Sequence, residues 1–210
     1  MARHIGPSCR LCRLEGEKLF LKGKRCFTEK CGVERRGYPP GQHGGGRRRR
    51  RQSEYAVQLR EKQKVKRIYG IGEKQFRNLF QRAARVPGLT GENLLVALES
   101  RLDNIVYRLG FTPSRKSARQ LIRHGHVRLD GRTVDIPSFV VAPGAEISIA
   151  PRAAEMPLVK EAVEDRKNRD QLSWLGVDYA RASGRMLERP SRADIPLAVE
   201  EQLIVELYSK

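Results

Sequence analysis

The chain has 210 residues, a length typical of one or two domains. Its 42 Lys and Arg residues exceed its 24 Asp and Glu residues, which gives a formal net charge of +18 at pH 7. A surplus of this size favours a polyanionic partner, because each Lys or Arg placed on a phosphate releases condensed counterions. No apolar run approaches the roughly 20 residues of a membrane span, and the N-terminus lacks the apolar stretch of a signal peptide. We therefore expect neither a membrane protein nor a secreted one.

The charge is distributed unevenly along the chain. Residues 1–51 hold 15 basic and 4 acidic residues, a net charge of +11, whereas residues 151–210 hold 10 and 11, a net charge of −1. This asymmetry predicts a basic N-terminal arm that binds nucleic acid and a C-terminal quarter that packs on protein. Five consecutive arginines at 47–51 repel one another, so we interpret them as a phosphate-binding segment that orders on contact.

All the cysteines lie in the first 31 residues, and they are Cys9, Cys12, Cys26 and Cys31. Their spacing, C-x2-C-x13-C-x4-C, is typical of a four-thiolate zinc site, because each close pair can face one ion. The segment is too short and too polar to build a core, so a metal would supply its folding energy. Four thiolates also suit an iron–sulfur cluster. A disulfide pair and four free thiols are less favoured alternatives, since nothing places the chain in an oxidising compartment.

The segment after the arm has the pattern of a small helical bundle. Residues 38–44, Tyr-Pro-Pro-Gly-Gln-His-Gly, predict a loop because Pro and Gly deny regular hydrogen bonding. A helix is expected to begin near Ser53, a suitable N-cap, and to end at Gly70. Apolar spacing predicts a second helix around residues 76–83 and a third that begins at Thr90.

Residues 99–150 predict two short helices followed by a small antiparallel sheet. One amphipathic helix ends at Gly110, and a second runs from Arg115 to His124 with a basic arc beside its apolar arc. The period then becomes two, and Asp130-Gly131 between the alternating runs is a strong hairpin signal. We expect another short strand at residues 146–149.

With these motifs, the sequence resembles the S4 family of small-subunit ribosomal proteins. Residues 99–150 are similar to the small RNA-binding module for which that family is known. The other specific motifs are Tyr-Pro-Pro-Gly-Gln-His-Gly at 38–44, Tyr-Ala-Val-Gln-Leu-Arg-Glu-Lys-Gln-Lys at 55–64, and the ending Glu-Gln-Leu-Ile-Val-Glu-Leu-Tyr-Ser-Lys at 201–210. The resemblance covers nearly the whole chain.

The resemblance implies an α+β fold in which a discontinuous helical lobe contains an inserted RNA-binding module. The expected organisation is a four-cysteine metal-bound arm at 1–45, a helical lobe at 46–98 that is completed by about 160–210, and the module at 99–159. Some family members carry a metal site in the arm, so the resemblance also supports zinc, or an iron–sulfur cluster, at the four cysteines.

The implied role is that of a structural constituent of the cytoplasmic small ribosomal subunit. Family members bind small-subunit rRNA early in assembly, at a junction of helices. They lie beside ribosomal proteins S3 and S5, near the mRNA where it enters the subunit, and they contribute to translational accuracy. Phosphate contacts would fix register without reading sequence, and specificity would come from the shape of the RNA junction.

The residues expected to bind RNA are basic side chains of the arm, the first long helix and the module, together with one histidine. We expect His4 and His43 to be polar or RNA-facing, because four cysteines already complete a metal tetrahedron. The expected set is Arg3, Arg10, Arg35, Arg36, His43, Arg47, Arg48, Arg49, Arg50, Arg51, Arg60, Lys62, Lys64, Lys66, Arg67, Arg115, Lys116, Arg119, Arg123 and Arg132.

Two departures from the family pattern affect particular segments. The stretch of three glycines and five arginines at 44–51 is longer and more basic than usual, which leaves its path on RNA open. Glu200 stands where Asn is usual, and Glu is a weak N-cap. Residues 203–207 therefore suit either a helix or a strand.

Two other functions were weighed against this one. Arg101-Leu102-Asp103 resembles the motif around the catalytic aspartate of a pseudouridine synthase, but Asp103 is more simply read as a cap or an ion-pair partner. The chain has no nucleophile constellation, dinucleotide-binding motif or P-loop, so we expect no enzyme activity and no small-molecule substrate. The second alternative is a zinc-dependent DNA-binding regulator that uses the two short helices. Trp174 is expected to be a packing anchor.

Overall fold

The computed structural model describes residues 4–42, 44–45, 53–167 and 171–209. The chain divides into two compact units, residues 1–91 with 198–210, and residues 92–197. Arg3, His43 and the five arginines at 47–51 lie outside the described residues, so their expected RNA contacts stay predictions. Within the described ranges, none of the helices combines the length and the apolar character that crossing a bilayer needs.

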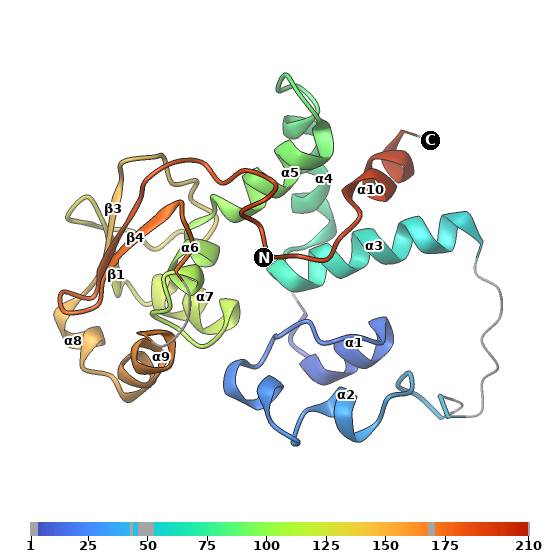
Figure 1. The fold of residues 1–210 in the computed structure, drawn as a ribbon, viewed down its shortest axis with the longest axis horizontal. Helices are drawn as coiled ribbons and strands as arrows, with labels where there is room; N and C mark the ends of the chain where they lie inside the picture. The colour runs from blue at the N-terminus through green and yellow to red at the C-terminus, as the bar shows by residue number, and fades with distance from the viewer. Residues whose placement is uncertain (1–3, 43, 46–52, 168–170, 210) are drawn as a thin grey trace. The chain divides into compact units, whose positions relative to one another are not determined.

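The first unit is helical (Figure 1). Its elements in chain order are α1 (Ser8–Glu15), the 3₁₀ segment η1 (Gly23–Phe27), α2 (Gly32–Arg35), α3 (Glu54–Tyr69), α4 (Glu73–Ala83), the first residues of α5 (Thr90–Glu99), and α10 (Glu201–Tyr208).

Helix α3 has the predicted ends. The Ser53 hydroxyl accepts a hydrogen bond from the Ala56 N–H at 3.3 Å, which satisfies one of the unpaired donors of the first turn. Gly70 ends the helix in the left-handed conformation, with φ 62°, where a residue without Cβ is favoured.

Helix α10 packs along α3 and completes the unit (Figure 1). Ile204 is buried, and the Gln58 side-chain amide donates to the Glu206 carboxylate at 2.9 Å. The last segment is therefore a helix and not a strand. Glu200 makes no side-chain cap, so α10 owes its position to this packing.

The second unit contains most of α5 and the elements of the module. They are α6 (Leu102–Arg108), α7 (Arg115–Arg123), β1 (Val127–Leu129), β2 (Arg132–Thr133), β3 (Glu146–Ile149), α8 (Pro151–Ala154), α9 (Pro157–Lys167), β4 (Leu175–Asp178) and β5 (Ser183–Met186). The strands form one antiparallel sheet in the order β2-β1-β3-β5-β4.

The hairpin between β1 and β2 has the predicted turn. Asp130 and Gly131 both have positive φ, 48° and 79°, as a two-residue type I′ turn requires. The pairing aligns Leu129 with Arg132. The apolar faces of α6, α7 and the sheet enclose one core, and Trp174 is fully buried in it, as expected for a packing anchor.

The unit boundaries differ from those expected at 98/99 and 159/160. Strand β5 pairs with β3, with Ile147 opposite Gly184, and so draws residues 160–197 into the sheet of the module. Gly184 lets β5 pack closely against the end of α6, since a Cβ there would lie 2.5 Å from a methyl carbon of Leu109. Only residues 198–210 return to the helical unit.

Candidate nucleic-acid interface and cysteine cluster

Helix α7 is the basic helix of the second unit. The Ser114 hydroxyl caps its start by accepting the Ser117 N–H at 3.2 Å, and Gly125 follows its end with φ 72°. Ala118, Leu121 and Ile122 are buried in the core, which fixes the faces that the remaining side chains occupy.

Asp103 joins α6 to α7 through two arginines. Arg101 donates to its two carboxylate oxygens, from Nε at 3.0 Å and from a terminal nitrogen at 2.8 Å. Arg119 donates to Asp103 Oδ2 from Nε at 3.1 Å and from a terminal nitrogen at 2.5 Å. The Asp103 side chain is only 4% exposed, so each charge-assisted bond compensates a desolvated charge. Asp103 is an ion-pair partner, as expected.

A second buried carboxylate, Glu99, organises the start of α7. Arg108 donates to its two oxygens at 2.9 and 2.7 Å, and the Asn104 side chain donates to it at 2.6 Å. Arg115 then donates from Nε to Asn104 Oδ1 at 2.7 Å, and its guanidinium lies 4.6 Å from the centre of the Tyr107 ring. The inner arginines of α7 are thus held by carboxylates and an aromatic ring of the same unit.

The predicted basic arc of α7 therefore divides into two parts. Arg115 and Arg119 are half-buried and bonded inside the unit, whereas Lys116 and Arg123 are exposed. Beyond the helix, Arg132 is exposed on β2 as well. The exposed part of the arc is the part that is accessible to a polyanion.

One exposed cation of the β1–β2 hairpin was not predicted. Arg128 lies on β1 between the half-buried or buried positions 127 and 129. The alternation of the strand signals its outward direction.

The basic residues expected on α3 form ion pairs within the first unit. Lys62 and Lys66 bind the Glu73 carboxylate at 2.6 and 2.9 Å. Lys64 binds Glu17 at 2.9 Å and donates to the Ala198 carbonyl at 2.6 Å. These pairs tie α4, the arm and the C-terminal segment to α3, and the expected phosphate contacts of the lysines stay predictions.

Arg60 and Arg67 of α3 also pair with a carboxylate of the first unit. Both pair with Glu15 at the end of α1, whose side chain is 4% exposed. Arg60 also donates to the Leu14 carbonyl at 3.1 Å. Burial lowers the pKa of Arg67 from its ordinary value. The arm is therefore held on α3 by ion pairs between Glu15 of α1 and the two arginines of α3.

The other expected residues of the arm lie on its surface. Arg10 is exposed on α1, Arg35 ends α2, and Arg36 follows it, both exposed. The neighbouring Arg13 instead holds the Pro-Gly loop, because it donates to the carbonyls of Tyr38 at 3.0 Å and Pro39 at 3.3 Å.

The four cysteines come together around one small hollow of the arm. Cys9 and Cys12 lie on α1, Cys26 lies in η1, and Cys31 precedes α2; all four line the hollow, and none forms a disulfide. A Cβ at Gly32 would lie 2.8 Å from that of Cys9, so this glycine allows the close approach.

The thiol side chains do not form a coordination sphere as they stand. Among the described residues, no group of three or more His, Cys, Asp or Glu side chains has an arrangement that could hold a metal ion. The Lys22 N–H donates to Cys26 Sγ at 3.3 Å, and burial raises the pKa values of the Cys12 and Cys26 thiols. His4 is exposed and does not line the hollow.

Comparison with known proteins finds two family models that match adjacent parts of the chain. The model of the "Ribosomal protein S4/S9 N-terminal domain" matches residues 3–99, and that of the "S4 domain" matches residues 100–147. Proteins named small ribosomal subunit protein uS4 from Thermus thermophilus, Desulforamulus reducens and Geotalea uraniireducens are 55%, 56% and 55% identical to the chain. Each alignment spans 210 residues and covers both chains completely.

The division of α7 predicts different effects for two charge reversals on one helix. Arg119→Glu removes two hydrogen bonds from Asp103 and places a second carboxylate beside it, so we expect a loss of about 3 kcal/mol in the free energy of unfolding. Arg123→Glu changes an exposed side chain and is expected to stay within about 0.5 kcal/mol of the parent. Urea unfolding followed by Trp174 fluorescence measures both. Equal effects of the two substitutions would contradict the division.

The Glu73 network predicts a pH-dependent stability. Burial alone would raise the pKa of Glu73, but hydrogen bonds from Lys62 and Lys66 outweigh it and lower the pKa from 4.5 to about 2. The lowered pKa stabilises the fold above pH 4.5, and this contribution is lost as the pH falls towards 2. The difference in urea midpoint between the parent and Glu73→Gln should therefore shrink from pH 6 to pH 2.5, measured by far-UV circular dichroism.

The control for this measurement is Glu54→Gln. Glu54 is exposed in the first turn of α3, and it makes no ion pair within the described part of the chain. Its difference from the parent should stay small at every pH. A Glu73→Gln difference that does not change with pH would refute the assignment.

Proposed function

The chain belongs to the uS4 family of small-subunit ribosomal proteins, and we propose that it holds folded rRNA mainly through contacts to sugar and phosphate. It is a structural constituent of the small ribosomal subunit and an rRNA-binding protein with an S4 domain, not an enzyme. The observation that carries the proposal is the division of α7, in which buried carboxylates fix the inner arginines and leave the outer cations to the solvent.

The mechanism follows from the kinds of group on this surface. Lys116 and Arg123 on α7 and Arg128 and Arg132 on the β1–β2 hairpin are exposed cations, and His124, which follows Arg123 in the chain, can donate hydrogen bonds to phosphate oxygens. Such contacts position the protein without reading bases. Because the deep groove of A-form RNA hides its base edges, recognition depends on the shape of the folded RNA. Helix α7 presents a fixed protein surface to that RNA. Its orientation is fixed because Arg115 and Arg119 cannot turn away without breaking buried bonds.

We further propose the finer role implied by the sequence resemblance. The chain would bind early, at a junction of rRNA helices, and would lie beside proteins S3 and S5 near the mRNA where it enters the subunit. The near-neutral C-terminal quarter supports a protein-facing role, as do its exposed acids Asp178 and Glu188. Contacts there would give the chain its influence on translational accuracy.

The arm is proposed to hold zinc at Cys9, Cys12, Cys26 and Cys31. The donor set fits, because four thiols line one hollow and a backbone N–H already donates to Cys26 Sγ. Binding would require the thiols to turn toward a common centre. The metal would contribute folding energy to a segment with little apolar core and would supply no catalytic chemistry. An iron–sulfur cluster at the same thiolates is the alternative.

Binding to small-subunit rRNA is expected to weaken steeply with salt. If phosphates dominate, the logarithm of the association constant falls linearly with the logarithm of salt concentration, by roughly one unit of slope per neutralised phosphate. Filter binding of the full chain to a small-subunit rRNA transcript between 50 and about 400 mM salt measures the slope. A flat response would contradict the proposed mechanism.

The metal proposal predicts about one zinc per chain in protein purified without oxygen. Elemental analysis measures the metal, and Cys26→Ser should reduce its content strongly. Chelation should lower the far-UV signal of the arm and leave the near-UV signal of Trp174 unchanged, since Trp174 lies in the other unit. If the protein contains iron and absorbs visible light, the group is an iron–sulfur cluster and not zinc. A metal-free chain with a folded arm would contradict both the zinc and the cluster proposal.

A further inference from the structure

The four thiols of the arm differ in how accessible they are. Cys9 is partly exposed, whereas Cys12, Cys26 and Cys31 are buried. All four line one hollow, and the chain has no other cysteine. An oxidant in solution therefore reaches Cys9 first, and an oxidised Cys9 has other thiols around it.

Cys12 is the neighbour that is placed to react with an oxidised Cys9. The two residues lie three positions apart on α1, so their side chains share one face of the helix. A Cys-x-x-Cys pair near the start of a helix is the arrangement in which redox proteins close a disulfide. Helical spacing puts the two Cβ atoms about 5–6 Å apart, and a disulfide needs about 3.5–4.5 Å. The start of α1 must therefore tighten.

The first turn of α1 allows this adjustment. Its N-cap is Pro7, and no side chain bonds to the turn as a cap. The Arg10 N–H donates to the Pro7 carbonyl at 3.1 Å, which is the bond of a 3₁₀ turn. Side chains three residues apart eclipse in 3₁₀ geometry, so tightening in this direction brings Cys9 toward Cys12.

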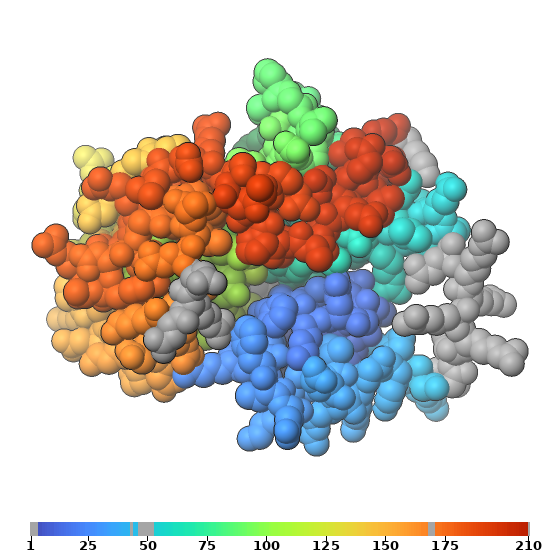
Figure 2. Space-filling model, in the orientation of Figure 1, coloured from blue at the N-terminus to red at the C-terminus, as the bar shows by residue number. Residues whose placement is uncertain are grey.

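Helix α1 is held on α3 without help from the thiols. Glu15 pairs with Arg60 and Arg67, and Glu17, just beyond the helix, binds Lys64 at 2.9 Å. In Figure 2 the darker blue of α1 lies toward α3, and the lighter blue of η1 and α2 lies on the far side. Residues 20–36, which include η1 and α2, are here called the distal half of the arm.

The distal half depends on the thiol cluster for its position. Its Glu34 binds Lys18 at 2.6 Å, but the two side chains are 55% and 32% exposed, and such a pair contributes little stability. The closer contacts involve cysteines. The Lys22 N–H donates to Cys26 Sγ at 3.3 Å, and Gly32 packs against Cys9.

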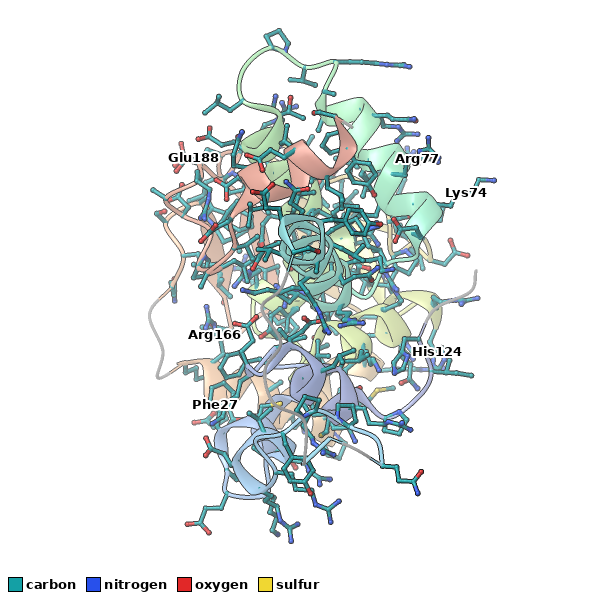
Figure 3. The ribbon with its side chains drawn as sticks, turned by 90° about the vertical axis from the view of Figure 1, so that its right-hand side faces the viewer. Phe27, Lys74, Arg77, His124, Arg166 and Glu188 are labelled. Atoms are coloured by element: carbon teal, nitrogen blue, oxygen red, sulfur yellow. The ribbon has the colours of Figure 1, made fainter. Side chains whose placement is uncertain are left out.

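The largest apolar side chains of the distal half do not fix it either. Phe20 and Phe27 stack on each other with centroids 5.1 Å apart, and they are 40% and 57% exposed. Figure 3 shows Phe27 at the edge of the arm. A change in the thiol cluster therefore affects the distal half more than it affects α1.

We propose that the cysteine cluster is a redox-sensitive switch, in which Cys9 is oxidised first, Cys12 closes a disulfide with it, and the distal half loosens while α1 stays on α3. One disulfide removes two of the four donors, so the site no longer holds its metal. This inference rests on the proposed metal site and adds its regulation.

The chemistry balances with hydrogen peroxide as the oxidant. Cys9 Sγ attacks one peroxide oxygen, the O–O bond breaks, and the hydroxide leaves with the thiol proton as water, which gives a sulfenic acid. Cys12 Sγ then attacks Cys9 Sγ, so that the S–S bond forms and the S–O bond breaks. The second hydroxide leaves as water with the Cys12 proton. The two sulfurs lose two electrons to the peroxide, and a dithiol reductant reverses the disulfide.

The first test locates the disulfide in the full chain, purified with its metal and treated with limiting hydrogen peroxide. The remaining thiols are alkylated, the disulfide is reduced, and the released thiols take a second label before mass spectrometry. We expect the second label at Cys9 and Cys12, with zinc released in step to a chromophoric chelator. A second label mainly at Cys26 and Cys31, or zinc release without a disulfide, would overturn the proposal.

A matched pair of variants tests the entry point. Cys9→Ser and Cys31→Ser each remove one of the four donors, but only Cys31→Ser keeps the Cys9–Cys12 pair. With the same excess of zinc, Cys31→Ser should lose thiols to peroxide within about twofold of the parent rate, and Cys9→Ser roughly tenfold more slowly, because its remaining thiols are buried. Equal rates would refute the role of Cys9. The labelling of the parent chain decides the question if a variant does not fold.

The structural consequence is measured by amide hydrogen exchange. Oxidation should speed exchange in residues 20–36 and leave α3 unchanged. Because Arg35 and Arg36 belong to the distal half, the association constant for a small-subunit rRNA transcript should fall roughly tenfold, about 1.4 kcal/mol. A dithiol should restore both, which separates the disulfide from methionine oxidation. Unchanged exchange and affinity in the disulfide form would overturn the switch.

The failures of the two proposals are distinguishable. A reduced chain without metal is the failure of the metal proposal, and the labelling still decides whether Cys9 and Cys12 form the disulfide. A reduced chain that contains zinc and keeps it under peroxide is the failure of the switch alone.

Discussion

The net charge of +18 opposes a compact fold through repulsion between cations, and carboxylates placed between the cations offset that repulsion. Each unit uses a few buried or half-buried acids for this purpose. In the second unit, Glu99 and Asp103 accept six charge-assisted bonds from arginines. In the first unit, Glu15 and Glu73 hold the arm and α4 on α3. These pairs hold the inner cations of α3 and α7 within their own units.

This constraint explains which parts of the binding surface the sequence could predict. Helical spacing correctly placed Arg115 and Arg119 on α7 next to the apolar face, and it placed the long helix from Ser53 to Gly70. It could not show that the inner arginines meet Asp103 and Glu99, because those contacts join different helices.

The fold shows a similar division between local and long-range information. Helix ends, the Asp130-Gly131 hairpin and the burial of Trp174 were predicted, because caps, turn residues and a single large aromatic side chain act locally or dominate their surroundings. Strands β4 and β5 were not predicted, since Leu-Gly-Val-Asp and Ser-Gly-Arg-Met have weak strand propensity. The packing of β5 against the end of α6 depends on the small size of Gly184 beside Leu109, which is a tertiary property.

The separation of inner and outer cations also determines how the chain responds to ionic strength. Exposed charges are screened within about 10 Å at 0.1 M salt, whereas buried pairs are screened much less. Salt would therefore weaken the proposed contacts of Arg123 to phosphate before it weakens the ion pairs of Asp103 with Arg101 and Arg119. The protein can leave RNA while keeping its fold, and it presents the same cation arrangement when it binds again. An interface built from the internally paired arginines would lose shape and affinity together.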